Sequence, residues 1–108
     1  MWFRKKTTSL SPAANDAAIF DMPIDDAFKL KVAGRVVVVG VVAAGEIRPG
    51  MDLRIRTPET TIPVKVIALE AFHQPLKYAH VGDNVAALLD GVERDQVVPG
   101  SRLTGGGG

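Results

Sequence analysis

The stretch GRVVVVGVVAAGEIRPGMDLRIR, residues 34–56, decides the fold class of this chain. Its valines are β-branched and favour extended backbone, and an unbroken apolar run predicts a strand buried on both faces. Gly40 interrupts the run, as a bulge or a bend at a barrel corner would. Gly45 and the triplet Arg48-Pro49-Gly50 predict turns, because glycine readily adopts the positive φ that a chain reversal needs.

Alternating apolar and charged residues predict further strands on both sides of this stretch. Leu53 and Ile55 alternate with Arg54 and Arg56, which is the period of a half-buried strand. Similar patterns bounded by glycine and proline predict strands at residues 28–32, 61–72, 84–89 and 102–104, with a loop at 74–82. No amphipathic helix is expected. We therefore predict an all-β fold, a small closed antiparallel β-barrel of about six or seven strands.

Length and composition restrict the chain to one small domain. It has 108 residues, 13 basic and 12 acidic side chains, a formal net charge of +1, two histidines and no cysteine. These values exclude a globally basic nucleic-acid binder, disulfides and thiolate metal sites, and they do not favour a histidine-rich metal site.

The ends of the chain differ in composition from its body. We expect a disordered polar and basic leader at 1–17, a β-barrel domain at 18–104 and a flexible glycine tail at 105–108. The N-terminal cations lead into a polar stretch rather than an apolar one, and no apolar run reaches about 18 residues. The expected location is the cytoplasm, without membrane contact.

Five motifs occur in the order and with nearly the gaps of one known family. They are Met22-Pro23-Ile24-Asp25-Asp26-Ala27-Phe28, the glycine rhythm of Gly34, Gly40, Gly45 and Gly50, Glu70-Ala71-Phe72-His73, Gly82-Asp83-Asn84-Val85, and Leu88-Leu89-Asp90-Gly91-Val92-Glu93-Arg94. Together they resemble the second domain of translational GTPases, closest to that of elongation factor Tu. The resemblance covers nearly the whole body and implies a closed antiparallel β-barrel.

A GTPase also needs a glycine-rich phosphate loop, G-x-x-x-x-G-K-[ST]. The sequence contains no such motif and no other nucleotide-binding motif. The resemblance is therefore to the middle barrel of these factors without the GTPase domain, and neither GTP nor another cofactor is expected.

By this resemblance, the chain is a stand-alone, non-catalytic module that binds the aminoacylated 3′ end of tRNA, or ribosomal RNA or protein. The pocket positions of the family correspond here to Asp25, Asp26, Phe28, Glu70, Phe72, His73 and Asn84. An aromatic ring suits an unstacked base, and carboxylate and amide oxygens suit ribose hydroxyls and an α-ammonium group. His73 stands where the family has arginine, which replaces a permanent, fork-shaped cation with an imidazole.

The same residues also have structural interpretations. Phe28 and Phe72 are then core side chains, Asp25 and Asp26 cap a turn, and Asn84 hydrogen-bonds its own loop. The two histidines, His73 and His80, are interpreted as loop residues rather than metal ligands. Arg54, Arg56 and Lys65 form a basic stripe that is only solvated.

Two other interpretations of the function stay open. The chain is a protein-interaction or regulatory module that kept the barrel and lost RNA binding, or it is a domain excised from a longer factor. Enzymatic activity is not expected, because no serine has a placed base and the adjacent carboxylates Asp25 and Asp26 point apart in a strand.

Overall fold

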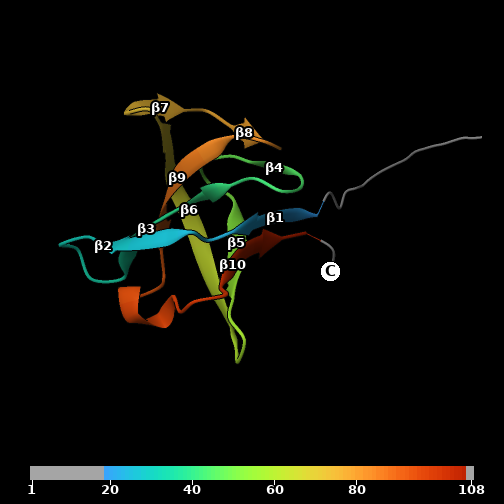
Figure 1. Ribbon diagram of the computed structural model, residues 1–108. Helices are drawn as coiled ribbons and strands as arrows, with labels where there is room; N and C mark the ends of the chain where they lie inside the picture. Colours follow the sequence, from blue (N-terminus) through green and yellow to red (C-terminus); the bar gives the residue numbers. More distant parts are fainter. Residues whose placement is uncertain (1–18, 107–108) are drawn as a thin grey trace, which may run out of the picture.

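The computed structural model describes residues 19–106 and shows an all-β domain (Figure 1), which confirms the predicted fold class. The predicted leader at 1–17 lies outside the described residues, as do residues 107–108 of the glycine tail. The elements of the described part are β1 Phe20–Pro23, β2 Asp26–Lys29, β3 Arg35–Val41, β4 Glu46–Ile47, β5 Asp52–Arg56, β6 Thr61–Ala71, β7 Gln74–Leu76, β8 Ala79–His80, β9 Asn84–Asp90, the short 3₁₀ helix η1 Arg94–Gln96 and β10 Arg102–Gly105.

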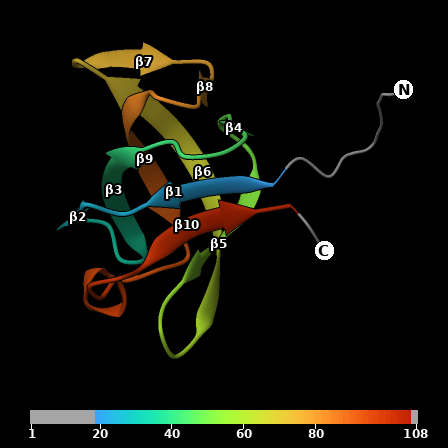
Figure 2. The same cartoon turned by 45° about the vertical axis from the view of Figure 1, so that its right-hand side comes forward.

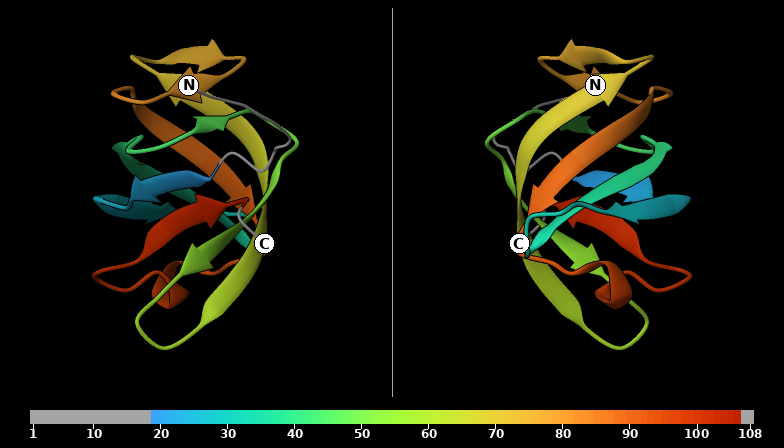
Figure 3. Two further views of the ribbon diagram at one scale, coloured as in Figure 1. Left: turned by 90° about the vertical axis from the view of Figure 1, so that its right-hand side faces the viewer. Right: turned by 90° about the vertical axis from the view of Figure 1, so that its left-hand side faces the viewer.

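Seven strands follow one hydrogen-bonded path in the order β1-β10-β5-β6-β9-β3-β2, and all neighbours are antiparallel. Strand β7 adds to β6, and β4 pairs with β8 in a second, small sheet. Figures 2 and 3 show the main sheet curling round on itself. Its two edge strands, β1 and β2, are consecutive in the chain. The curl therefore brings together the two halves of a single bent segment, residues 20–29.

The expected closed barrel is corrected at this point, because hydrogen bonds do not close the sheet. The bent segment changes partner within two residues. The N–H of Ile24 donates to the carbonyl of Ser101, before β10, at 3.1 Å, and the N–H of Asp25 donates to the carbonyl of Val39 in β3 at 2.8 Å. The chain itself therefore connects the two edges of the sheet at this corner, and no ladder of hydrogen bonds forms between β1 and β2.

Glycine is needed at position 40 for a reason other than the predicted bulge. It lies in regular register opposite Val85 in the β3–β9 ladder. A Cβ placed on Gly40 would overlap the carbonyl oxygen of Pro23 and would lie 3.1 Å from the Cγ of Met22. The absent side chain is thus what lets the corner between β1 and β2 pack directly on β3. The register shift of the sheet lies elsewhere, between Val66 and Ala68 in β6.

The core lies inside the curl, and most strands alternate between it and the solvent. Val36 and Val38 of β3 are fully buried, whereas Val37 and Val39 are only partly buried. The prediction that this valine run is buried on both faces is therefore wrong. One face of β3 meets the core, and the other remains partly exposed because no second layer covers it.

The predicted strand at residues 28–32 is also corrected. Strand β2 ends at Lys29, and the chain then turns back so that the N–H of Leu30 donates to the carbonyl of Arg35. Ala27 is the residue of β2 that enters the core, so its neighbour Phe28 points outward and is 51% exposed. The phase of this strand is set by its pairing with β3, which the alternation of Phe28 with lysines does not reveal.

Two further boundaries differ from the expectation. The predicted loop at 74–82 contains β7 and β8. Gly105, placed by its composition in the tail, ends β10 and pairs with Phe20, and a Cβ there would overlap the side chain of Leu53. In the described part of the chain, no helix is long and apolar enough to span a membrane.

Candidate functional site

The outer face of strands β2, β3, β9 and β6 carries a row of residues with a carboxylate at each end. The register pairs Asp26 with Val39, Val39 with Ala86, and Ala86 with Glu70. Directly paired residues of neighbouring strands point to the same side of a sheet. Since neighbouring strands lie roughly 4.8 Å apart, the two acidic positions flank about 14 Å of apolar surface.

The next row on this face continues the apolar surface. It runs from Phe28 through Val37 and Leu88 to Ala68. These side chains are partly or largely exposed. An uncovered face of this kind is typical of a binding surface, because apolar side chains gain stability only when something removes them from water.

A hollow of about 300 Å³ at one end of the face gathers four of the seven predicted site residues. It is lined by Glu70, Phe72, His73 and Asn84, together with Val39, Ala71, Val85 and Ala86. Glu70 comes from the end of β6, Asn84 begins the neighbouring β9, and Phe72 and His73 connect β6 to β7. We define these four residues as the polar–aromatic hollow.

Phe72 and His73 form the two-residue turn of the β6–β7 hairpin in a backbone conformation that is costly for both. Ala71 pairs with Gln74 across the turn, and φ is 53° at Phe72 and 64° at His73. Two-residue hairpin turns with positive φ usually carry asparagine and glycine, and other residues cost about 1–2 kcal/mol each there. Strain of this kind tends to be retained at functional sites.

The turn also decides what Phe72 can do. Its side chain is 91% exposed, so the interpretation of Phe72 as a core residue is wrong. A flat aromatic ring is presented to solvent at the lip of the hollow. The Phe-His pair carries none of the usual turn signals, which explains why sequence reasoning predicts a continuous strand followed by a loop.

Asn84 is positioned by the turn that precedes it. The backbone N–H of His80 donates to Oδ2 of Asp83 at 2.9 Å, and Nδ1 of His80 lies 2.8 Å from the same oxygen. The hydrogen bond from the His80 backbone, aided by the imidazole, lowers the pKa of Asp83 below its ordinary value. Among residues 19–106, no hydrogen bond involves the side chain of Asn84, so its amide is available at the rim of the hollow.

The structure places Asp25 and Asp26 in a separate hollow of about 230 Å³ beside Arg94. Oδ1 of Asp26 accepts the N–H of Ala27 at 2.8 Å. Nε of Arg94 donates to the carbonyl of Ala27 at 2.7 Å, which attaches η1 to β2. Asp26 still shares the outer face with Glu70, whereas Asp25 lies at the corner between β1 and β2.

Phe28 lines neither hollow and belongs to the apolar row between them. Its exposure shows that the core interpretation is wrong for this residue as well. Within the part of the chain that the structure describes, no group of three or more potential ligands could hold a metal ion.

Fold and surface together define a small antiparallel β-domain with one exposed apolar face, bordered by carboxylates and an exposed aromatic turn. Residues 35–104 match the family model described as elongation factor Tu domain 2. The chain therefore belongs to the elongation factor Tu domain 2 family. This confirms the resemblance to a translational GTPase domain, and the matched part of such factors is non-catalytic.

Solved structures with a similar fold include translation elongation factor SelB from Methanococcus maripaludis. Its apo form is 34% identical, with a TM-score of 0.72, and the match covers 80% of this chain and 18% of that one. The same factor in complex with the GTP analogue GPPNHP is 31% identical, with a TM-score of 0.74, and the match covers 83% and 19% of the two chains. This chain thus corresponds to about a fifth of the length of SelB.

Proposed function

We propose that this translation-factor domain binds the aminoacylated 3′ end of tRNA on the outer face of β2, β3, β9 and β6. The observation that supports this most strongly is Phe72, held 91% exposed by a strained turn beside Glu70, His73 and Asn84. A single-stranded 3′ end presents an unstacked base, and such bases stack on exposed aromatic rings. A translation module of this kind would act in the cytoplasm.

Each residue of the polar–aromatic hollow has a chemical role in this proposal. Phe72 stacks on the terminal base. The carboxylate of Glu70 accepts hydrogen bonds from ribose hydroxyls or from the α-ammonium group, and the amide of Asn84 can accept and donate. His73 offers a ring nitrogen where the family has arginine. Asp26, at the far end of the same row, supplies a second carboxylate for an amino-acid side chain or ammonium group.

A titration of charged against uncharged tRNA tests the proposal directly. We expect micromolar binding of aminoacyl-tRNA that weakens between about 50 and 200 mM salt, because backbone contacts release counterions. Phe72→Ala removes one stacking platform, which is worth about 1–3 kcal/mol, or roughly 5- to 150-fold in affinity. Asn84→Ala should reduce the preference for the charged form.

The matched control is Tyr78→Ala. Tyr78 is an exposed aromatic residue outside the hollow, with its ring 5.9 Å from that of His80. Its removal should leave tRNA affinity unchanged within about twofold. Equal binding of charged and uncharged tRNA, or equal losses in the Phe72 and Tyr78 variants, would contradict the assignment of the hollow.

His73→Arg offers a gain-of-function test. Arginine would restore a permanent cation with a planar array of donors at the position where the family carries one. We expect tighter binding of aminoacyl-tRNA, by about three- to tenfold at low salt, with a steeper salt dependence. Weaker binding of the arginine variant would show that the imidazole itself makes the contact.

A further inference from the structure

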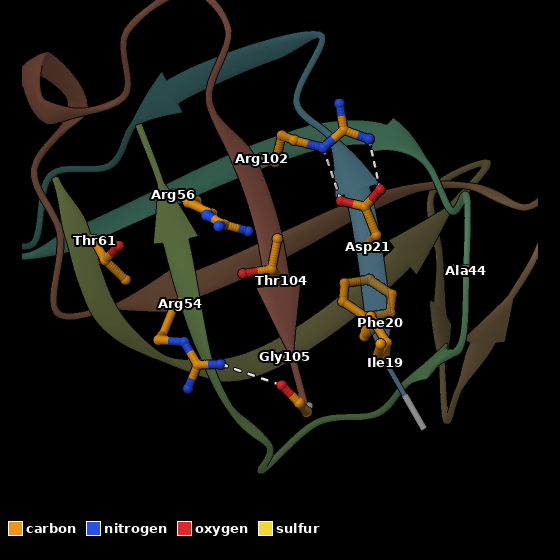
Figure 4. A pocket seen from close by; sticks show the side chains of 11 residues that line it. Ile19, Phe20, Asp21, Ala44, Arg54, Arg56, Thr61, Arg102, Thr104 and Gly105 are labelled. Atoms are coloured by element: carbon orange, nitrogen blue, oxygen red, sulfur yellow. Dashed lines mark hydrogen bonds and ion pairs between the residues drawn. The ribbon is translucent and has the colours of Figure 1, made fainter. Parts of the chain in front are cut away.

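A third hollow lies between β1, β5 and β10, at the opposite end of the strand order from β9, β3 and β2. Its volume is about 670 Å³. Three arginines line it, Arg54, Arg56 and Arg102, together with the hydroxyls of Thr61 and Thr104 (Figure 4). We define it as the arginine hollow.

The sheet register forces these arginines together. Arg54 and Arg56 occupy alternate positions of β5 and so share a face, and Arg102 of β10 is directly opposite Arg56. Like charges in directly opposed positions of a sheet destabilise it. Three guanidinium groups in one place are therefore costly to the fold unless an anion balances them.

Within the described part of the chain, the positive charge of the three arginines is only partly neutralised. Asp21 is the carboxylate in the hollow, and its Oδ1 accepts Nε of Arg102 at 2.9 Å, with a second contact from Nη2 to Oδ2. Nη2 of Arg54 donates to a neutral acceptor, the carbonyl of Gly106, at 3.3 Å. Among residues 19–106, Arg56 has neither an ion pair nor a side-chain hydrogen bond. Three cations thus face one carboxylate.

Lys65 does not belong to this cluster, although it shares the sequence stripe with Arg54 and Arg56. Its ammonium group lies 3.4 Å from Oδ1 of Asp52, so this charge is already paired. The uncompensated charge is carried by arginine, whose planar donors match the oxygens of a phosphate group in pairs. Two threonine hydroxyls add neutral donors of the kind that commonly contact phosphate oxygens.

We propose that the arginine hollow binds the phosphate backbone of single-stranded RNA, separately from the 3′-end surface. Alternate residues of a strand lie roughly 7 Å apart, so Arg54 and Arg56 can engage successive charges of a linear polyanion. The hollow reads charge rather than sequence, because the one aromatic ring among its lining residues, that of Phe20, is buried and offers no stacking platform. The proposal does not rest on the proposed tRNA function.

The probe for this site is a labelled oligouridine of about ten nucleotides, titrated against the full chain at several salt concentrations. Arg56→Gln should lower affinity by about three- to tenfold at roughly 50 mM salt and reduce the salt slope by about 0.7, the value for one single-strand phosphate contact. Arg56→Lys keeps the charge and should preserve the slope. If the glutamine variant fails to fold, Arg54→Gln tests the same assignment, because Arg54 lines the same hollow and its neutralisation should also reduce the salt slope by about 0.7.

Arg48→Gln is the matched control, because Arg48 is exposed and lies outside the hollow, beside Glu46. It should leave the slope unchanged. Phe72→Ala should also leave the slope unchanged, whatever it does to affinity, so failure of the 3′-end proposal can be told apart from failure of this one. Equal slope changes in the Arg48 and Arg56 variants would overturn the proposal. So would equal binding of a polyglutamate peptide, or a response to inorganic phosphate without any binding of RNA.

Discussion

Replacing Gly40 with alanine tests the corner that joins the two edges of the sheet. Gly40 has ordinary strand conformation and a regular partner in Val85, so alanine is not opposed by the backbone angles. The obstacle is space. The new Cβ would overlap the carbonyl oxygen of Pro23 and press on Met22, and backbone cannot move aside as a flexible side chain can.

The expected cost follows from three contributions. Overpacking against a well-packed neighbour costs about 1–3 kcal/mol. Displacing the corner also weakens the hydrogen bonds of Ile24 with Ser101 and of Asp25 with Val39, at about 0.5–1.5 kcal/mol each. Alanine also lowers the conformational entropy of the unfolded chain relative to glycine, and this offsets about 0.4–1 kcal/mol of the destabilisation. We expect Gly40→Ala to lower the free energy of unfolding by about 2–4 kcal/mol, or the Tm by roughly 10–25 °C.

Urea unfolding followed by far-UV circular dichroism measures this change, and Gly50→Ala is the matched control. Gly50 has φ of 94°, and beyond its chain neighbours no atom lies within 4 Å of the place a Cβ would take, so its substitution costs only conformational strain, about 1 kcal/mol. A Gly40→Ala variant within about 0.5 kcal/mol of the parent would refute the packing argument. Equal losses in the two variants would point to backbone conformation rather than space.

Three further predictions concern stability. His73→Gly relieves the positive φ of 64° and should raise the free energy of unfolding by about 1 kcal/mol in the same urea assay; a loss would mean that the imidazole makes a stabilising contact. The hydrogen bond from Arg102 lowers the pKa of Asp21, so this carboxylate stabilises the fold above its unfolded-state pKa, and the contribution disappears as pH falls through the lower folded-state value. Urea midpoints between about pH 2.5 and 7 should therefore decline less on the acid side for Asp21→Asn than for the parent, from roughly pH 4 downward, and parallel curves would exclude the pair as a contributor. Ser101 is 3% exposed, and its Oγ donates to the carbonyl of Val98 at 2.6 Å and accepts the Val98 N–H at 3.2 Å; Ser101→Ala should cost about 1–3 kcal/mol in a thermal melt, and an unchanged Tm would show that the turn does not need the hydroxyl.

The candidate site is predictable where short motifs carry its chemistry. Glu70-Ala71-Phe72-His73 and Asn84 are far enough apart in sequence that only the pairing of β6 with β9 and the turn after β6 bring them to one hollow. The motif at 22–28 is recognisable too, yet its members separate in space. Asp25 and Asp26 line a separate hollow with Arg94, and Phe28 joins the apolar row, because β2 pairs with β3 and not with β6.

The arginine hollow cannot be recognised from spacing. Arg54 and Arg56 are visible as one face of an alternating strand, but the sequence stripe groups Lys65 with them. Pairing of β10 with β5 puts Arg102 there instead, while Asp52 neutralises Lys65. Cross-strand neighbours decide which charges remain unbalanced, and these neighbours cannot be predicted from a local sequence pattern.

Sequence alone determined the all-β class, the presence of the strands that the structure bounds at 52–56 and 61–71, the turns at Gly45 and Gly50, and the family, since alternation and glycine geometry act over a few residues. Tertiary structure alone decided which face of a strand is covered and how the sheet ends meet. Phe28 is outside because Ala27 meets the core, Gly40 is needed because a distant corner crosses it, and Phe72 is exposed because a hairpin forces its backbone into a rare conformation. Each of these depends on the strand that lies alongside, which is set by packing of the whole chain rather than by neighbours in sequence.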